Sequence, residues 1–149
     1  MSSESDGIRL DFTNWPVVLV MPPMRVVSDA ELETCMSEFS RVIDGRKQPY
    51  AVVVDLRESS GLTPTQRQRI SNSMGDTDAR VLAGYPNCGG ALVFSSALLR
   101  GMLTAILWIR KPKHETRVFA NPQDAILWAR VCVQQFADRS GGDRSLQQA

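Results

Sequence analysis

The feature that most constrains the fold is a short stretch, Tyr50 to Leu56, in which every residue except Asp55 is apolar. A strand with one face in water alternates apolar and polar residues, whereas a strand buried on both faces is apolar almost throughout. Strands of the second kind belong to parallel sheets that helices cover. The stretch therefore predicts a central strand of an α/β domain.

The residues that precede this strand predict a β-hairpin. Residues 8–12 alternate apolar and polar side chains, and a continuous apolar run follows from Val17 to Met21. Thr13 and Asn14 are typical turn residues and lie between the two segments. We expect the domain to open with this hairpin, after a polar and acidic N-terminus, 1–7, that we expect to be disordered.

The signals of a first helix follow the hairpin. Ser28 and Glu31 have the spacing of a capping box, in which each side chain accepts a hydrogen bond from the other residue's backbone. Gly45 is predicted to end the helix in the left-handed conformation. The apolar residues with helical spacing are Leu32, Cys35, Met36, Phe39, Val42 and Ile43.

A second helix is predicted to begin at Thr63 and Pro64. Proline is favoured at the first helical position, and Gln66 completes a second capping box with Thr63. The apolar stripe of this helix is thin, so the helix is predicted to be largely exposed. Its members are Ile70, Met74 and Val81.

The remainder of the chain continues the alternation of strands and helices. Strands are predicted at 91–95 and 115–119, and helices at 97–109 and 121–136, with a glycine turn at 88–90 before the third strand of the parallel set. The order ββαβαβαβα, joined by right-handed crossovers, predicts a mostly parallel sheet with helices packed on it. The fold class is therefore α/β, a β-hairpin followed by βαβ units.

We expect a single domain over 8–137, followed by a disordered C-terminal tail over 138–149. The length of 149 residues suits one domain. The formal net charge of +1 supplies no field for nucleic acid, so we expect no nucleic-acid partner. Three widely spaced cysteines, the absence of a secretion signal, and a helix at 97–109 too short to span a bilayer predict a cytoplasmic protein. We expect the domain to be of bacterial type.

Polar residues follow the predicted parallel strands at the edge where open sheets bind ligands. They are Asp55 and Arg57 after one strand, and Ser95 and Ser96 after the next. A phospho-accepting receiver domain would also need an acidic metal pair and a lysine at this edge. A haloacid-dehalogenase-type phosphatase would need a second aspartate where Arg57 stands. Neither constellation is encoded, so we regard this edge as a binding site and not a catalytic one.

Metal and hydrolase chemistry are weakly supported by the sequence. His114 is the single histidine, lies in a loop before an edge strand, and has no clustered carboxylates beside it. A serine hydrolase would also need a nucleophile elbow, which is absent. We therefore expect no metal, no cofactor and no enzymatic activity.

Several segments carry a family resemblance. The strand end at 53–57 reads Val-Val-Asp-Leu-Arg, and the closing elements read Thr-Arg-Val-Phe at 116–119 and Ala-Ile-Leu-Trp at 125–128. With the order of the elements, these motifs resemble the SpoIIAA-like branch of STAS domains, which is related to the lipid-binding Sec14 (CRAL-TRIO) fold. The resemblance covers residues 8–136 and implies a cytosolic binding domain.

Classical members of that branch are anti-anti-sigma factors, which are switched by phosphorylation of a serine at the start of the second helix. The resemblance implies that Ser59 and Ser60 correspond to this segment. Only Arg57 and Glu58 separate them from Asp55 and Leu56, whereas the classical members have a longer segment at this place. A phosphate at Ser60 would lie close to Arg57 and Arg67, while Thr63 caps the helix. The alternative is that Ser59 and Ser60 belong to an unmodified loop.

The predicted helix at 97–109 is apolar nearly all round, although one face suffices to cover a sheet. We expect its second face to bind a partner or another copy of the chain, as a dimer or larger oligomer. The interface candidates are Leu99, Met102, Leu103, Ile106 and Trp108. The basic stretch 110–117 could contact a membrane or an acidic partner, but a solvated charge run is the favoured interpretation.

Three functional hypotheses follow. The first is a non-catalytic STAS-like regulatory domain that binds a protein partner or itself and is open to control by phosphorylation. The second is a carrier of a small apolar or lipid-like ligand, as the relation to Sec14 would allow. The third is a hydrolase that uses Asp55, Arg57 and Ser95.

Overall fold

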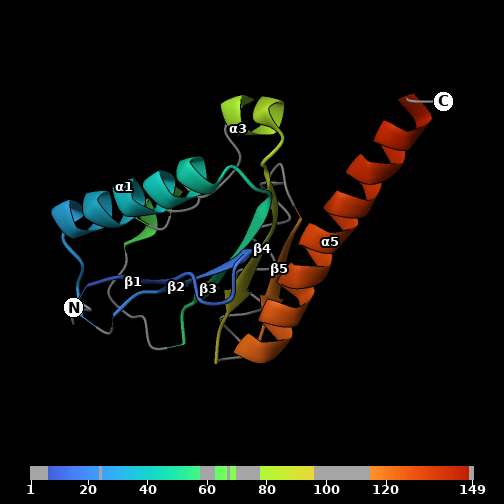
Figure 1. Ribbon diagram of the computed structural model, residues 1–149. Helices are drawn as coiled ribbons and strands as arrows, with labels where there is room; N and C mark the ends of the chain where they lie inside the picture. The colour runs from blue at the N-terminus through green and yellow to red at the C-terminus, as the bar shows by residue number, and fades with distance from the viewer. Residues whose placement is uncertain are drawn as a thin grey trace.

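The computed structural model describes residues 7–23, 25–57, 63–66, 68–69, 78–95 and 115–147. These residues form one five-stranded sheet with helices packed on both of its faces (Figure 1). The strands are β1 (Arg9–Asp11), β2 (Val17–Met21), β3 (Tyr50–Asp55), β4 (Asn87–Val93) and β5 (Thr116–Phe119). The helices are α1 (Asp29–Arg46), α3 (Asp78–Ala83) and α5 (Pro122–Gln147).

The strand order in the sheet is β1-β2-β3-β4-β5. β1 pairs with β2 in the antiparallel sense, with Leu10 opposite Val20, and this confirms the predicted hairpin. The pairs β2–β3, β3–β4 and β4–β5 are all parallel. The α/β architecture with a mostly parallel sheet is therefore confirmed, and β3 is its central strand as the apolar stretch predicted.

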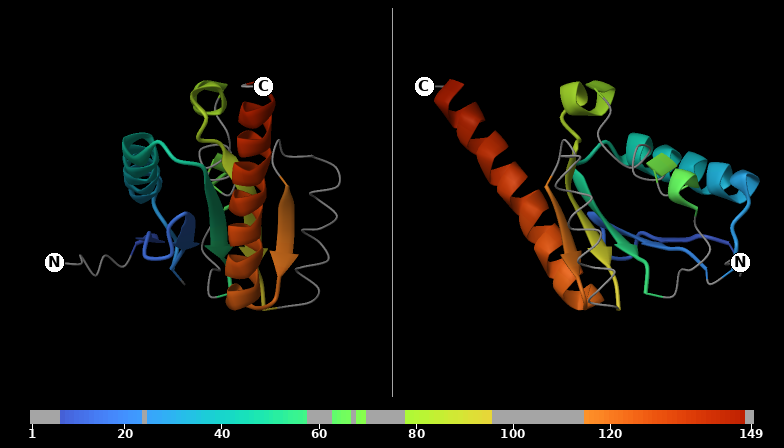
Figure 2. Two further views of the ribbon diagram at one scale, coloured as in Figure 1. Left: turned by 45° about the vertical axis from the view of Figure 1, so that its right-hand side comes forward. Right: turned by 180° about the vertical axis from the view of Figure 1, so that it is seen from behind.

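Successive residues of the strands divide between two apolar layers because their side chains point to opposite faces. Val18 and Val52 face the layer that includes Phe39 of α1. Val17 and Val53 face the layer that includes Ala129 of α5. α1 and α5 accordingly lie on opposite sides of the sheet (Figure 2).

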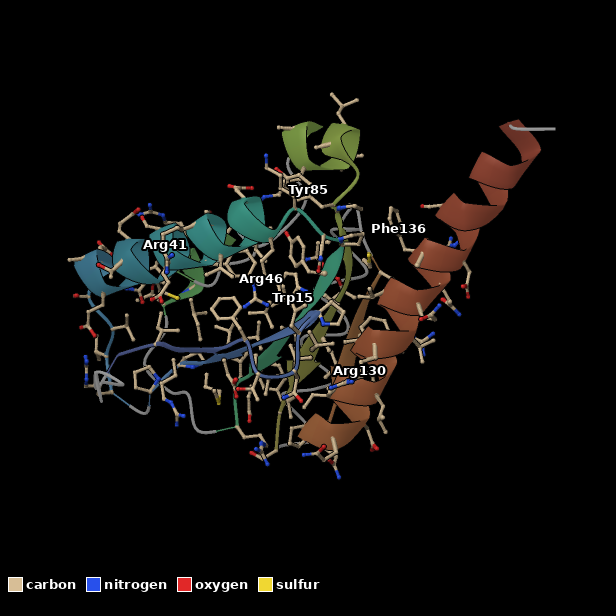
Figure 3. All side chains as sticks on the ribbon, in the orientation of Figure 1. Trp15, Arg41, Arg46, Tyr85, Arg130 and Phe136 are labelled. Carbon is tan, nitrogen blue, oxygen red and sulfur yellow. The ribbon has the colours of Figure 1, made fainter. Side chains whose placement is uncertain are left out.

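A cation–π contact connects the hairpin to the end of α1. The guanidinium of Arg46 lies 4.5 Å from the ring centre of Trp15 (Figure 3). The indole Nε1 of Trp15 donates a hydrogen bond of 2.8 Å to Oε1 of Gln48. Both contacts hold the β1–β2 connection against the C-terminus of α1.

The first helix begins as predicted but ends differently. Ser28 and Glu31 form the complete capping box. The left-handed residue at the other end is Lys47, with φ of 53°, and Gly45 lies within the helix, so the predicted glycine cap is wrong. The left-handed conformation costs an L-residue about 1–2 kcal/mol, and the 3.0 Å hydrogen bond from Lys47 N to Ile43 O offsets part of that cost.

The glycines before the predicted third parallel strand lie within that strand and do not form a turn. β4 begins at Asn87 and includes Gly89 and Gly90, which corrects the sequence interpretation. A Cβ atom at position 89 would lie 2.9 Å from Sγ of Cys132 and 3.1 Å from Cη2 of Trp128, both on α5. The glycine is therefore required by the close approach of α5 to β4.

The second helical region also departs from the prediction in part. Pro64–Gln66 are helical as expected, and we call them the 64–66 turn. Val81, predicted to belong to the apolar stripe of this helix, lies in α3 and is 49% exposed. Ile70 and Met74 lie outside the described residues.

The last helix is longer than its apolar pattern predicted. The inward positions Ala125, Ala129 and Cys132 are buried, as expected. The helix does not end near residue 136, however, and residues 138–147, predicted as a disordered tail, are helical. In Figure 1 the C-terminal part of α5 extends away from the sheet. An apolar stripe marks a helix that packs on a sheet, so the sequence pattern did not predict this part. No helix in the described part of the chain is long and apolar enough to cross a membrane.

Candidate functional site

The four parallel strands place their carboxyl ends at one edge of the sheet, where ligands bind in open α/β folds. Interstrand bonding continues just past the strand ends. Leu56 N donates to Val93 O at 2.9 Å, and Phe94 N donates to Phe119 O at 2.9 Å. The residues that follow β3, β4 and β5 are consequently held close to this edge.

Asp55 and Arg57 are brought together at this edge. The Arg57 side chain donates from Nε to Oδ1 at 3.0 Å and from Nη2 to Oδ2 at 2.8 Å. The backbone N–H of Arg57 also donates to Oδ1 at 3.1 Å. The carboxylate is therefore held by both the fork of the guanidinium and the backbone of the following turn.

This pairing favours the ionised form of Asp55. The hydrogen bond from the Arg57 guanidinium is the main cause that holds the pKa of the Asp55 carboxyl below its usual value, and burial opposes it. Because a lowered pKa keeps the group ionised at neutral pH, Asp55 is suited to accept hydrogen bonds and poorly suited to exchange protons. The arrangement suits a structural or binding carboxylate.

Thr63 has the capping role that its sequence position predicts. Its Oγ1 accepts a hydrogen bond of 3.1 Å from Gln66 N, and its own N–H donates to Oε1 of Gln66 at 3.1 Å. Ser95 lies two residues after Val93, the β4 residue that pairs with Asp55, and is exposed. Among the described residues, the predicted site thus comprises the ion pair of Asp55 with Arg57, the helix cap at Thr63 and the exposed hydroxyl of Ser95.

The connection between β2 and α1 carries a second ion pair. Arg25 donates from Nη1 and Nη2 to the two carboxylate oxygens of Glu31 at 3.0 and 2.6 Å. These hydrogen bonds, with that from Ser28 N, lower the pKa of Glu31 to about 2. Val26 beside them is 74% exposed, whereas Val27 is 1% exposed.

The start of α5 lies at the carboxyl end of β5, on the same edge of the sheet as Asp55. Oδ1 of Asn121 accepts a hydrogen bond of 2.8 Å from Gln123 N, and Asn121 O accepts one of 3.3 Å from Ala125 N. Asn121 therefore caps α5, as its sequence position predicted.

This chain has a SpoIIAA-like fold. An uncharacterized protein of the DUF3478 family from Shewanella loihica PV-4, whose structure has a SpoIIAA-like fold, matches it with a TM-score of 0.57. The match has 14% sequence identity and covers 83% of this chain and 92% of that chain. The predicted resemblance is confirmed at the level of the fold. No protein-family model and no curated protein matches the chain.

Much of the predicted site of this SpoIIAA-like domain lies outside the described residues. These positions are Ser59, Ser60, Arg67, Ser96, Leu99, Met102, Leu103, Ile106, Trp108 and His114. Within the described ranges, no group of three or more His, Cys, Asp or Glu side chains is placed to hold a metal ion. The chemistry of the described edge is that of ion pairs and helix caps.

Two features of this edge were not predicted from the sequence. The pairing of Arg25 with Glu31 spans six residues and corresponds to no regular spacing. Gln66 was recognised as a capping residue, but its hydrogen bond to Val27 was not; Val27 lies 39 residues earlier in the chain, before α1 and β3. A local pattern carries no signal for contacts of this kind.

Proposed function

We propose that this SpoIIAA-like chain is a non-catalytic, STAS-like regulatory domain that acts by binding a protein partner and by self-association. The observation that carries the proposal is the three-bond attachment of Asp55 to Arg57. Asp55 is the acidic residue at the carboxyl end of the central strand, the position from which a catalytic carboxylate would act.

The ion pair supports a binding role for energetic reasons. A general base needs a pKa near the working pH, and the pKa of Asp55 is lowered. General-base catalysis by Asp55 would also require its carboxylate to leave the Arg57 guanidinium and accept a proton from the substrate. A surface that contacts a partner makes no such demand, since the charges act there through hydrogen bonds and complementarity.

Phosphorylation at Ser59 or Ser60 is the regulatory part of the proposal. A phosphate adds roughly two negative charges, which favour a helix N-terminus and neighbouring arginines. The two serines lie four and three residues before the capped start at Thr63. Modification would therefore change the charge of the surface that a partner contacts without removing the cap.

The test compares the wild type with Asp55→Asn. Both proteins are assayed with a broad panel of hydrolase and phosphatase substrates, and both are used to purify partners from the native host for mass spectrometry. We expect no turnover from either protein, and modestly weaker partner binding by Asp55→Asn. Turnover by the wild type that Asp55→Asn abolishes would refute the non-catalytic role.

The regulatory part is tested separately with Ser60→Asp and the uncharged control Ser60→Ala. We expect Ser60→Asp to alter the affinity for the purified partner and Ser60→Ala to retain it. Phosphoproteomics of the native protein supplies the second measurement. If the loop is never phosphorylated and Ser60→Asp binds normally, the switch is wrong and the likeness to the classical members reaches the fold only.

A further inference from the structure

The starts of two helices at the carboxyl edge are joined by the side chain of Gln66. This residue belongs to the 64–66 turn, which lies beside α1 (Figure 2). Gln66 is 6% exposed and is one of three buried polar or charged residues in the described part of the chain. Buried side-chain amides in folded proteins nearly always form hydrogen bonds, because an unpaired buried polar group is destabilising.

The amide of Gln66 uses both of its ends. Nε2 donates to Val27 O at 2.7 Å and to Asp29 Oδ1 at 3.2 Å, and Oε1 accepts from Thr63 N at 3.1 Å. The carbonyl thus binds Thr63, the capping residue of its own turn, and the amino group binds the chain that leads into α1 and the first residue of that helix. One planar group therefore fixes the separation and the orientation of two helix starts.

The residues bound by Nε2 adjoin the cap of α1. Val27 immediately precedes the N-cap residue Ser28, and Asp29 is the first residue of the helix. Ser28 Oγ accepts from Glu31 N at 3.1 Å. Loss of the Gln66 contact would therefore leave the buried carbonyl of Val27 without this donor, directly beside the α1 capping box.

A second contact joins the same two elements farther along. Arg69, in the helical residues 68–69 that follow the 64–66 turn, forms an ion pair with Glu33 of α1. The side chains of Arg69 and Glu33 are 46% and 51% exposed, so this ion pair contributes little to stability. The buried Gln66 amide is the contact that can transmit a structural change.

We propose that Gln66 couples the two helix starts, so that opening or reorganisation at Thr63 changes the α1 start and the exposed Val26 beside it. Coupling requires an element whose state both sites influence, and the shared amide is that element. Its regulatory use rests on the proposed function, in which a phosphate on the serines before Thr63 controls partner binding. The coupling itself is a property of the isolated chain.

The test is amide hydrogen exchange by NMR on the full chain. The amides of Gln66 and Glu31 report the two helix starts, and the amide of Val53 in the central strand reports global unfolding. Thr63→Ala is expected to lower the protection of Gln66 by about fivefold, the factor of one lost cap. We expect protection of Glu31 to fall beyond any change at Val53.

The control and the background variant decide whether Gln66 is responsible. Thr34→Ala removes an exposed hydroxyl that donates to Ala30 O within α1, and it is expected to leave Gln66 unchanged. In a Gln66→Met background, Thr63→Ala is expected to leave Glu31 unchanged. The proposal is overturned if Glu31 does not respond to Thr63→Ala in the wild-type chain, or responds equally with methionine at position 66.

A reciprocal measurement keeps the test decisive if Gln66→Met does not fold. Coupling is mutual, so Ser28→Ala must lower the protection of the Gln66 amide in the wild-type background. Unchanged protection of Gln66 in Ser28→Ala would overturn the proposal. These measurements need no partner, so failure of the coupling is distinguishable from failure of the proposed binding function.

Discussion

Gly89 of β4 and Cys132 of α5 are in contact so close that a Cβ atom at position 89 would lie 2.9 Å from the sulfur atom. Trp128 Cη2 would lie 3.1 Å from the same Cβ atom. The absence of a side chain at residue 89 is thus what allows α5 to pack against the centre of the sheet.

Gly89→Ala is expected to destabilise the domain by about 1–3 kcal/mol, because the added methyl group forces the α5 side chains away from the sheet. The matched control is Gly45→Ala in α1, where nothing lies within 4 Å of the added Cβ atom. That variant is expected to gain about 0.5–1 kcal/mol from helix propensity. Urea denaturation measures both changes, and equal effects of the two substitutions would contradict this packing argument.

Arg80→Met is expected to destabilise the domain by about 1–3 kcal/mol. Arg80, with a side chain 5% exposed, donates to Asp44 Oδ1 at 3.0 Å and to the Tyr50 hydroxyl at 3.2 Å. Methionine fills much of the volume but supplies neither hydrogen bond. In the control Arg41→Met the replaced side chain is 75% exposed, and a change within about 0.5 kcal/mol is expected from thermal or chemical unfolding.

The ion pair of Arg25 and Glu31 predicts a pH dependence of stability. Folding lowers the pKa of Glu31 from 4.5 to about 2, so its contribution is present above the higher value and is lost as pH falls through the lower one. We expect the unfolding midpoint in urea to fall between about pH 5 and pH 2, and to fall less in Arg25→Gln. An NMR titration of Glu31 checks the cause, since Arg25→Gln must raise its pKa.

Thr63→Ala is expected to lower the free energy of unfolding by about 1 kcal/mol through loss of the helix cap. Thr63→Ser retains the hydroxyl that accepts from Gln66 N and is expected to retain most of the stability. Chemical denaturation of the three proteins measures the difference. Equal losses in the two variants would mean that the methyl group of Thr63, and not its hydroxyl, is what stabilises this region.

Self-association through the predicted helix at 97–109 is tested by Leu103→Glu. Wild-type protein at micromolar concentration is expected to be a dimer or larger oligomer in light scattering, and Leu103→Glu is expected to dissociate it or to unfold the domain. The control is Leu127→Glu on the outer face of α5, where the native side chain is 62% exposed. A monomeric wild type contradicts the prediction, and dissociation by Leu127→Glu would place the interface on α5.

Features that depend on neighbouring residues could be predicted from the sequence. The hairpin, the central strand and the capping boxes of Ser28 with Glu31 and of Thr63 with Gln66 arise from spacings of a few residues. The hydrogen bonds of the capping boxes form within one turn, and the apolar pattern of a few successive residues marks the strands, so the local order of residue types is sufficient to predict them. The same holds for the mostly parallel sheet, because alternation of strands and helices permits few arrangements.

The tertiary structure decided the features that depend on residues far apart in the chain. Gly89 and Gly90 lie in a strand and not in a turn, and at position 89 α5 packs where a side chain would otherwise stand. Gln66 is buried because the 64–66 turn meets the chain leading into α1 at Val27. The sequence by itself determined the type and order of most of the described strands and helices. Packing decided where β4 begins and which side chains meet, since burial and long-range hydrogen bonds act only once these segments are brought together.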